Sequence, residues 1–195
     1  MSTYTIIVDP EYILACKEFV PQKDAKGRNY LLGLRVELNK EDAFLIATDG
    51  HVLVAYHHNE GHNDPDQGRL DFTVPKELLT GLKPRGSVAI TMDDDLKTCT
   101  LSQQGASRSA NFIADRYPDW RRVIPGQVTG EVALYDPALM VGIAKAAKHL
   151  GSSSCYVTPN GDSGGHVTFG REEIFGIVMP MRGPLVRSFP EWCRE

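Results

Sequence analysis

The sequence has no paired cysteines, no long hydrophobic run and no excess of basic charge. Its four cysteines lie far apart among 195 residues and form no Cys-x-x-Cys pair. This spacing predicts reduced thiols rather than a disulfide or a metal site, with three in the core and Cys193 in the tail. No apolar run approaches the ~18 residues of a membrane span, and the N-terminus lacks the basic stretch of a signal peptide. We therefore expect a cytoplasmic protein.

The formal net charge of −4 argues against a protein that binds nucleic acid through its whole surface, although it permits a local basic face. His57, His58 and His62 lie in or beside a polar loop, without the recurring carboxylate or thiol spacing of a metal site. The sequence therefore predicts neither a metal nor another cofactor. The hydrophobic content of 42% is that of an ordinary folded protein.

Three stretches of the chain repeat one pattern: a strand-like run, a proline, and then a helical pattern of apolar residues. The prolines are Pro10, Pro75 and Pro137, which are 65 (75 − 10) and 62 (137 − 75) residues apart. A proline loses nothing at the first position of a helix, because its missing N–H would have no partner there. Asp9 and Asp136 stand where an N-cap carboxylate can accept free backbone N–H groups. The similar spacing indicates repeated modules.

Each module is predicted to contain one strand, one helix and three further strands, which gives an α+β fold of repeated β-α-β-β-β modules. Helices are expected over residues 10–20, 75–82 and 137–150, and Gly151 is well placed to end the last one. The later strands of the three modules are expected over residues 29–38, 44–47 and 52–57, over 87–92, 98–102 and 107–113, and over 155–158, 166–170 and 174–178.

One short motif stands between two of these strands, and two later motifs accompany it. Residues 47–51 read Ala-Thr-Asp-Gly-His and predict a hairpin turn, because glycine supplies the positive φ that a tight turn needs. Residues 117–125 read Tyr-Pro-Asp-Trp-Arg-Arg-Val-Ile-Pro, and residues 177–182 read Ile-Val-Met-Pro-Met-Arg. Taken singly, the first is typical of an ordinary turn and the last of an edge strand. Their joint occurrence favours one shared binding site.

Together, the three motifs resemble those of the bacterial DNA polymerase III beta subunit, the sliding clamp, in the order that the family has them. The resemblance covers residues 1–182 and implies the DNA clamp fold, with helices on one face of antiparallel sheets. A family chain carries six modules, so this sequence would be a shortened form with three. The resemblance implies a complete clamp-like domain of two modules over residues 1–125, a third module or half domain over 126–182, and a C-terminal tail over 183–195.

In the family, the three motifs line an apolar pocket that receives linear peptides of DNA polymerases, the clamp loader and repair proteins. Apolar side chains and adaptable methionines would hold leucine and phenylalanine, while arginines would reach peptide carbonyls or a carboxylate. Val52 departs from the family, which usually has an arginine after the histidine. By position, the resemblance implies a partner-peptide pocket of Thr48, Gly50, His51, Leu53, Pro118, Arg122, Val123, Ile177, Val178, Met179, Pro180, Met181 and Arg182.

The resemblance further implies a non-catalytic processivity factor that tethers DNA polymerase to double-stranded DNA without reading its sequence. In family rings the helices line the central hole, and basic side chains contact phosphates. A chain with half of the family's modules would need twice the copies, so self-association into a dimer or a tetramer is expected. The candidate DNA-facing residues are Lys17, Lys76, Lys83, Arg85, Lys145, Lys148 and His149.

Two other functions compete with this interpretation. The main alternative is a clamp mimic or adaptor, phage- or plasmid-borne, that binds replication proteins without encircling DNA. The remote alternative is a serine protease, because residues 161–165 read Gly-Asp-Ser-Gly-Gly. That chemistry needs a histidine base and a buried aspartate around Ser163, and the sequence lacks the histidine segment typical of trypsin-like enzymes. The tail, residues 183–195, is expected either to cover the pocket or to pack on a sheet edge.

Overall fold

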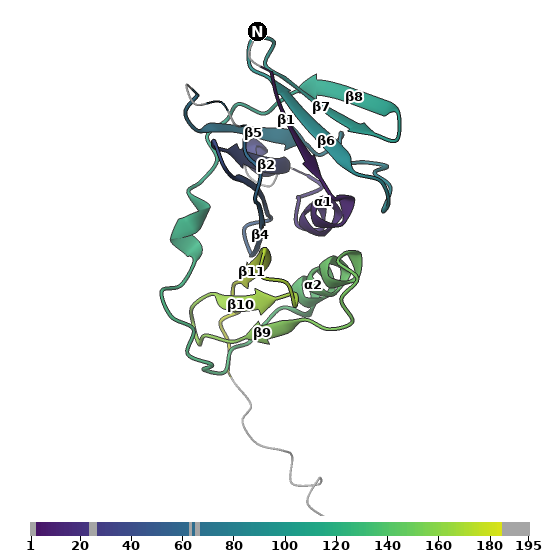
Figure 1. Cartoon of the computed structure of the whole chain (residues 1–195). Coiled ribbons are helices and arrows are strands. Elements are labelled where there is room, and N and C mark those ends of the chain that lie inside the picture. The colour runs from purple at the N-terminus through teal and green to yellow at the C-terminus, as the bar shows by residue number, and fades with distance from the viewer. Residues whose placement is uncertain (1–2, 24–26, 63, 65–66, 185–195) are drawn as a thin grey trace, which may run out of the picture.

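The computed structural model describes residues 3–23, 27–62, 64 and 67–184, and it consists of antiparallel sheets flanked by short helices (Figure 1). One sheet has four strands in the order β1-β6-β7-β8, and the other has seven in the order β5-β2-β3-β4-β11-β10-β9. In chain order the elements are β1 (Thr3–Val8), α1 (Pro10–Lys17), the 3-10 helix η1 (Asn29–Leu31), β2 (Gly33–Leu38), β3 (Ala43–Thr48), β4 (Val52–His58), β5 (Leu70–Pro75), β6 (Val88–Asp93), β7 (Thr98–Gln103), β8 (Ala106–Asn111), the 3-10 helix η2 (Trp120–Val123), α2 (Pro137–His149), β9 (Tyr156–Thr158), β10 (Gly165–Thr168) and β11 (Ile174–Val178).

The first module has the predicted order of one strand, one helix and three strands, in β1, α1, β2, β3 and β4. Exposed and buried residues alternate along β1, as expected for a strand with one face on the core. α1 begins at Pro10, and Asp9 occupies the N-cap position without a side-chain hydrogen bond. The predicted apolar stripe is confirmed, since Ile13, Cys16 and Val20 are all buried.

The second module lacks the predicted helix. Pro75 is the last residue of β5 rather than the first residue of a helix, and residues 76–81 form successive turns. Their hydrogen bonds join residues three apart, as in the bond from the Leu78 N–H to the Pro75 carbonyl at 3.0 Å. The N–H of Lys76 donates to the carbonyl of Leu32 at 3.1 Å, so the strand pairing with β2 extends beyond the proline. Asp9 and Asp136 directly precede the other two prolines, whereas Val74 directly precedes Pro75. No capping side chain is therefore present to start a helix here.

The third module confirms the helix and three strands, but its expected opening strand is reduced to one bridge between Leu134 and Met181. At the start of α2, the Asp136 carboxylate accepts from the N–H of Ala138 at 2.8 Å, as predicted for an N-cap. Gly151 ends the helix with a φ of 68°. Bonds from Gly151 to the Lys148 carbonyl and from Ser152 to the Ala147 carbonyl complete a Schellman cap.

The third module is joined to the first by a continuous sheet and by a charged contact. β11 pairs with β4 from Val178↔Val52 to Ile174↔Tyr56, so the seven-stranded sheet contains strands from both sides of residue 125. The division of the chain at that residue stays a prediction. Arg171, between β10 and β11, lies 2.6 Å from Glu11 and 2.8 Å from the hydroxyl of Tyr12, both in α1.

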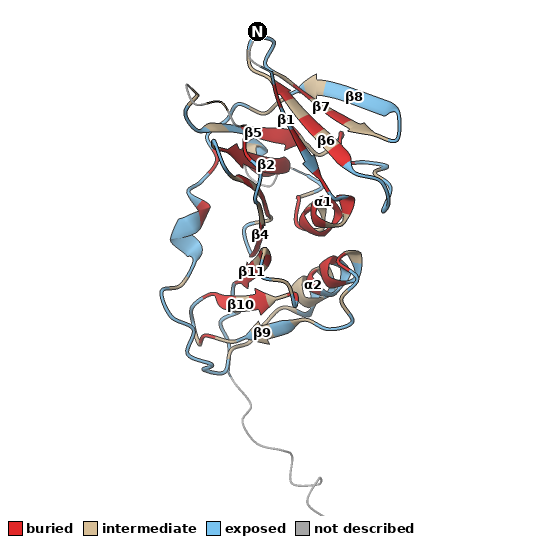
Figure 2. Cartoon of the chain, viewed as in Figure 1, coloured by how far each residue is buried: buried red, intermediate tan, exposed pale blue. Residues whose placement is uncertain are grey.

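Both helices lie on the same side of the seven-stranded sheet, as predicted, and the main core lies between them and the strands (Figures 1 and 2). None of the described helices is long and apolar enough to cross a membrane. Cys16 and Cys99 are buried free thiols and Cys155 is a half-buried one, while Cys193 lies outside the described residues. Most of the predicted C-terminal tail, residues 185–195, also lies outside the described residues.

Candidate functional site

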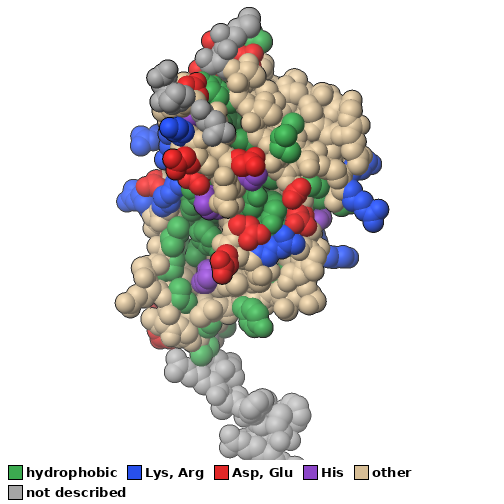
Figure 3. All heavy atoms as spheres, in the orientation of Figure 1, with side chains coloured by type: hydrophobic (Ala, Val, Ile, Leu, Met, Phe, Trp, Pro, Cys, Tyr) green, Lys and Arg blue, Asp and Glu red, His purple; other side chains and the backbone are tan. Residues whose placement is uncertain are grey.

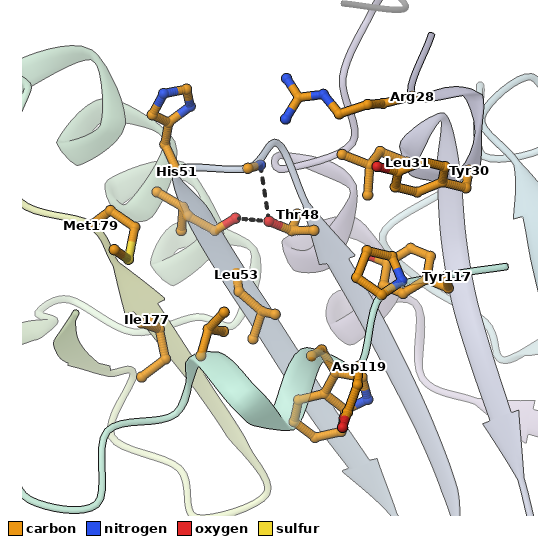
Figure 4. A pocket seen from close by; sticks show the side chains of 15 residues that line it. Arg28, Tyr30, Leu31, Thr48, His51, Leu53, Tyr117, Asp119, Ile177 and Met179 are labelled. Atoms are coloured by element: carbon orange, nitrogen blue, oxygen red, sulfur yellow. Dashed lines mark hydrogen bonds between the residues drawn. The ribbon is translucent and has the colours of Figure 1, made fainter. Parts of the chain in front are cut away.

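The hairpin between β3 and β4 forms as predicted, and its own side chains hold the turn. The Asp49 carboxylate accepts from the backbone N–H groups of His51 at 2.7 Å and Val52 at 2.8 Å. The Thr48 hydroxyl donates to the Val52 carbonyl at 2.7 Å and accepts from the N–H of Gly50 at 3.0 Å (Figure 4). Gly50 has a φ of 94°, which costs glycine little. These local hydrogen bonds therefore stabilise the shape of the turn.

A cavity of about 270 Å³ lies beside this turn. Leu53 and Ile177 are register partners on β4 and β11, and the N–H of Met179 donates to the His51 carbonyl at 2.8 Å. Figure 4 shows Met179, Ile177 and Leu53 on one side of the site, with Leu31 across from them. The walls are mainly apolar and aromatic. They are formed by Arg28, Tyr30, Leu31, Thr48, Gly50, His51, Val52, Leu53, Tyr117, Pro118, Asp119, Trp120, Val123, Ile177 and Met179.

The 3-10 helix η2 forms the outer wall of this cavity and is fixed by a charged cluster. Arg121 donates to one carboxylate oxygen of Glu37 at 2.8 Å, and Arg69 lies 2.6 Å from the other. The Glu37 side chain is 6% exposed, so two guanidinium groups neutralise a carboxylate that is nearly removed from water. The Arg121 guanidinium also lies 4.2 Å from the ring centroid of Trp120 and 5.1 Å from that of Phe44. These contacts fix η2 against β2 and β3.

Two buried donors in the cavity wall have no hydrogen-bond partner among the residues that the structure describes. They are the hydroxyl of Tyr117 and the indole N–H of Trp120. Burial raises the pKa of the Tyr117 hydroxyl, which therefore stays protonated and able to donate. A buried polar group without a partner costs free energy, and since both of these atoms are closed to solvent, a ligand in the cavity would contact the rings of these two residues rather than their donors.

The three motifs meet at this cavity, although they are far apart in the sequence. Of the residues predicted for the pocket, Thr48, Gly50, His51, Leu53, Pro118, Val123, Ile177 and Met179 line it. Arg122 lies outside, in a neighbouring cavity that shares Tyr30, Tyr117, Pro118 and Asp119 with the first.

The remaining predicted pocket residues lie outside the cavity because of their positions on β11 and beyond its end. Val178 is fully buried in the main core, since neighbouring residues of a strand point to opposite faces of the sheet. Pro180 is half-buried and Arg182 is exposed, and neither lines the cavity. Met181 lines a separate cavity with Leu134 and the turn after β9.

Several lining residues did not appear among the predicted ones. Tyr117, Asp119 and Trp120 stand within the second motif, so the motif itself carried the signal for them. Arg28, Tyr30 and Leu31 come from the segment around η1. The strand expected over residues 29–38 is wrong for its first part, because Asn29–Leu31 form the 3-10 helix η1 and β2 begins at Gly33. The fold brings η1 to the cavity because the segment leads into β2, which adjoins β3 of the hairpin.

Five of the predicted DNA-facing residues lie on or beside α1 and α2, where acidic side chains offset some of them. Glu18 lies 4.0 Å from Lys145 and 3.0 Å from His149. Lys17 is at the end of α1, and Lys76 donates to the carbonyl of Gln22, just after that helix. Lys83 and Arg85 are exposed in the turns before β6, and Lys148 is exposed on α2. Figure 3 shows acidic and basic side chains interspersed over the middle of this view.

The Gly161–Gly165 segment is a turn between β9 and β10, as the glycine-rich sequence predicts. The N–H of Ser163 donates to the Asn160 carbonyl at 3.0 Å. Within the described parts of the chain, no hydrogen bond joins Ser163 to a histidine. His57, the candidate base by analogy with a protease, pairs with Asp42 at 2.6 Å and stacks on Phe44. The segment therefore carries no catalytic triad.

Neither a protein-family model nor a curated protein matches this sequence, whereas solved structures match its fold. The DNA polymerase sliding clamp from Bacillus subtilis superposes with a TM-score of 0.70 at 13% identity, over 93% of this chain and 65% of that one. The sliding clamp from Pseudomonas aeruginosa with ligand gives 0.67 at 15% identity, over 92% and 66%. The Helicobacter pylori beta clamp bound to a DNA ligase peptide gives 0.69 at 11% identity, over 92% and 65%.

The chain thus has the α+β fold of DNA polymerase III beta sliding clamps. It spans just under two thirds of the length of these three clamps. The resemblance inferred from the three motifs is confirmed at the level of the fold.

Proposed function

We propose that this chain is a non-catalytic, sliding-clamp-like processivity factor that holds DNA polymerase and other replication proteins on double-stranded DNA. The cavity beside the Thr48–His51 turn would receive linear peptides of DNA polymerase and of a clamp loader. The observation that carries the proposal is the convergence of three distant motifs on one apolar cavity. One of the similar structures, the Helicobacter pylori beta clamp, is described as bound to a DNA ligase peptide.

The cavity suits one or two apolar side chains of an extended peptide. Its volume of about 270 Å³ lies at the lower end of the roughly 300–1,000 Å³ range typical of ligand pockets. Leu53, Ile177 and Met179 would contact leucine or phenylalanine, and methionine adapts its shape to either. Arg122, at the neighbouring cavity, would face a carboxylate or carbonyl of the same peptide.

A labelled peptide with a Gln-x-x-Leu-x-Phe motif should bind the purified chain in a fluorescence anisotropy titration. Met179→Asp should abolish binding, because an unpaired carboxylate would be buried against the peptide. Met181→Asp is the matched control, since Met181 is 47% exposed against 40% for Met179 but lies outside the cavity. Equal binding by the wild type and Met179→Asp would refute the pocket.

The alternative of a clamp mimic or adaptor keeps the same pocket but does not encircle DNA. One observation favours it: Glu18 reduces the positive charge of Lys145 and His149 on the helix side. Retention on DNA distinguishes the two functions. A closed ring of several copies would stay on nicked circular DNA and slide off after the circle is cut. An adaptor would bind the peptide and show no difference between circular and linear DNA.

A further inference from the structure

The first two modules complete each other by exchanging their opening strands. β1 opens the first module and pairs with β6, the first of the three later strands of the second module. β5 opens the second module and pairs with β2, the first of the three later strands of the first module. Each opening strand therefore covers a sheet edge of the other module. The third module has an opening segment, residues 131–135, and an equivalent first strand, β9, but no such exchange.

The opening segment of the third module occupies the same place as β5 does in the second. The Thr73 carbonyl of β5 accepts from the N–H of Ile113, just after β8, at 2.9 Å. The Leu134 carbonyl accepts from the N–H of Met181, just after β11, at 2.7 Å. In both modules, the opening segment thus forms an antiparallel bridge with the exit of its own module. β5 bonds to β2 on its other edge, whereas no described strand pairs with the corresponding edge of residues 132–135.

The backbone hydrogen bonds and the solvent exposure of residues 132–135 and of β9 both indicate unpaired strand edges in the described structure. In the described part of the chain, the main-chain N–H and C=O groups of Ala133 and Tyr135 make no hydrogen bond. β9 is paired with β10 along one side, and it ends the seven-stranded sheet. Every residue of the equivalent strand β2 is buried, whereas β9 is largely exposed (Figure 2). Tyr156 on β9 is 68% exposed and Val132 in the opening segment is 58% exposed.

We propose that the third modules of two copies of this chain exchange their opening segments around a two-fold axis, so that residues 132–135 of each copy pair with residues 153–156 of the other, at and just before the start of β9. A second copy is the occupant because the third module is self-complementary: it carries both the unpaired segment and the unpaired strand edge. Two copies satisfy both needs reciprocally, as an isologous contact requires. The inference rests on the self-association in the proposed function and specifies the surface that would carry it.

The two existing exchanges predict the register. In the first, Val8 is the last apolar residue before the proline, and Tyr4, four residues earlier, faces Met92. In the second, Val74 has the same place, and Leu70, four residues earlier, faces Leu38. Met92 and Leu38 are each the last inward residue before the turn to the next strand.

The equivalent residues of the third module are Tyr135 before its proline and Val157 before its turn. Glu131, four residues before Tyr135, then faces Val157 of the other copy. Gly130 and Glu131 bond to the module's own turn after β9, so the exchanged pairing begins at Val132. Val132 then faces Tyr156, and Ala133 faces Cys155. The two most exposed hydrophobic residues of this edge would thereby form an apolar cross-strand pair.

The first test is light scattering on dilutions of the full chain from high to low micromolar concentration. The wild type should have at least twice the monomer mass. Ala133→Pro should raise the dissociation constant about tenfold or more, because proline removes an N–H that the exchange needs but the monomer does not use. Unfolding of the variant in urea and its affinity for the peptide should match the wild type. A monomeric wild type, or an unchanged dimer in Ala133→Pro, would overturn the exchange while leaving the peptide pocket intact.

The second test uses the native Cys155 as a reporter. In a Cys193→Ser background, Ala133→Cys should form a disulfide between two copies under mild oxidation, visible as a dimer on a non-reducing gel. Cross-strand partners that are directly opposite have a Cα separation suited to a disulfide. Ala106→Cys, exposed on β8, is the control and should not cross-link to Cys155. Cross-linking of Ala106→Cys alone would assign the contact to β8 and reject the exchange.

Discussion

At the scale of single residues, the site depends on side chains that hold a backbone shape rather than on reactive groups. The side chains of Asp49 and Thr48 make four hydrogen bonds to the backbone within one turn, and Gly50 supplies the positive φ. The apolar residues that face the cavity then follow from strand alternation, because Leu53 and Val52 point to opposite faces of the sheet. A substitution in this strand therefore changes stability where the side chain faces the main core, and peptide binding where it faces the cavity.

Val52 gives a prediction at this scale. The resemblance to sliding clamps implies an arginine at this position, but the Val52 side chain is 1% exposed and packs in the main core. Val52→Arg should therefore lower the free energy of unfolding by about 3 kcal/mol or more, because the guanidinium would be buried without a partner. His51→Arg, one residue earlier and exposed, should change it by less than about 0.5 kcal/mol. Urea unfolding of both variants checks this, and equal stabilities would show that the core accommodates the charge.

At the scale of elements, one proline pattern led to two different structures. Pro10 and Pro137 begin helices, and each follows an aspartate at the N-cap position. Pro75 ends a strand, since no capping residue precedes it and the pairing of β5 with β2 extends beyond it. Gly81 and Pro84 further limit the length of any helix there, and a helix of this length is marginal without packing. Strand pairing with another module outweighed the local preference for a helix.

η2 provides the prediction at this scale, because its position depends on Glu37. Glu37→Gln keeps the shape of the side chain but removes the charge that Arg69 and Arg121 neutralise. The free energy of unfolding should fall by about 2 kcal/mol, and peptide affinity should fall several-fold because η2 forms the outer wall of the cavity.

Asp94→Asn is the control for Glu37→Gln. Its ion pair with Lys97 is exposed, with 46% of the Asp94 side chain accessible, so both quantities should stay nearly constant. Calorimetry with the peptide and urea unfolding measure the two effects. If Glu37→Gln lost stability but kept full peptide affinity, η2 would not shape the binding site.

At the scale of the whole molecule, charge and strand edges decide what the chain can assemble into. The helix side contains both signs of charge, in keeping with the overall charge of −4. The free edges of the two sheets include β8 and β9, both largely exposed (Figure 2). An exchange at β9 yields a dimer, and a second contact through β8 would be needed to close a ring of four copies. β4 already pairs with β11, so the second contact between copies would use β8 of the second module.

DNA binding by the helix side gives the prediction at this scale. Lys148→Glu should weaken retention on duplex DNA of any sequence, and the salt dependence of binding should become shallower by about one unit of slope. Lys145→Glu should have a smaller effect, since Glu18 already offsets part of that charge. Lys97→Glu, on the turn between β6 and β7, is the control and should leave retention unchanged. Filter binding at several salt concentrations tests this. If Lys148→Glu retained DNA as well as the wild type at low salt, α2 would not face DNA.

The sequence by itself determined the elements whose signals are local. The Asp-Gly turn, the aspartate-capped helix α2, its glycine stop and most strands depend on residues within a few positions of one another. The three motifs could also be recognised together, because each is continuous in the chain. For the same reason, the residues of the pocket that lie within the motifs were largely identifiable.

The tertiary structure alone decided the features that depend on partners far away in the chain. Pairing with β2 made Pro75 a strand end, and the absence of a paired edge among the described residues left residues 131–135 without a strand. The sheet order brought Arg28, Tyr30 and Leu31 to the cavity, and strand alternation turned Val178 away from it. Backbone hydrogen bonds between strands are long-range contacts, and no local propensity specifies which edge a strand will meet.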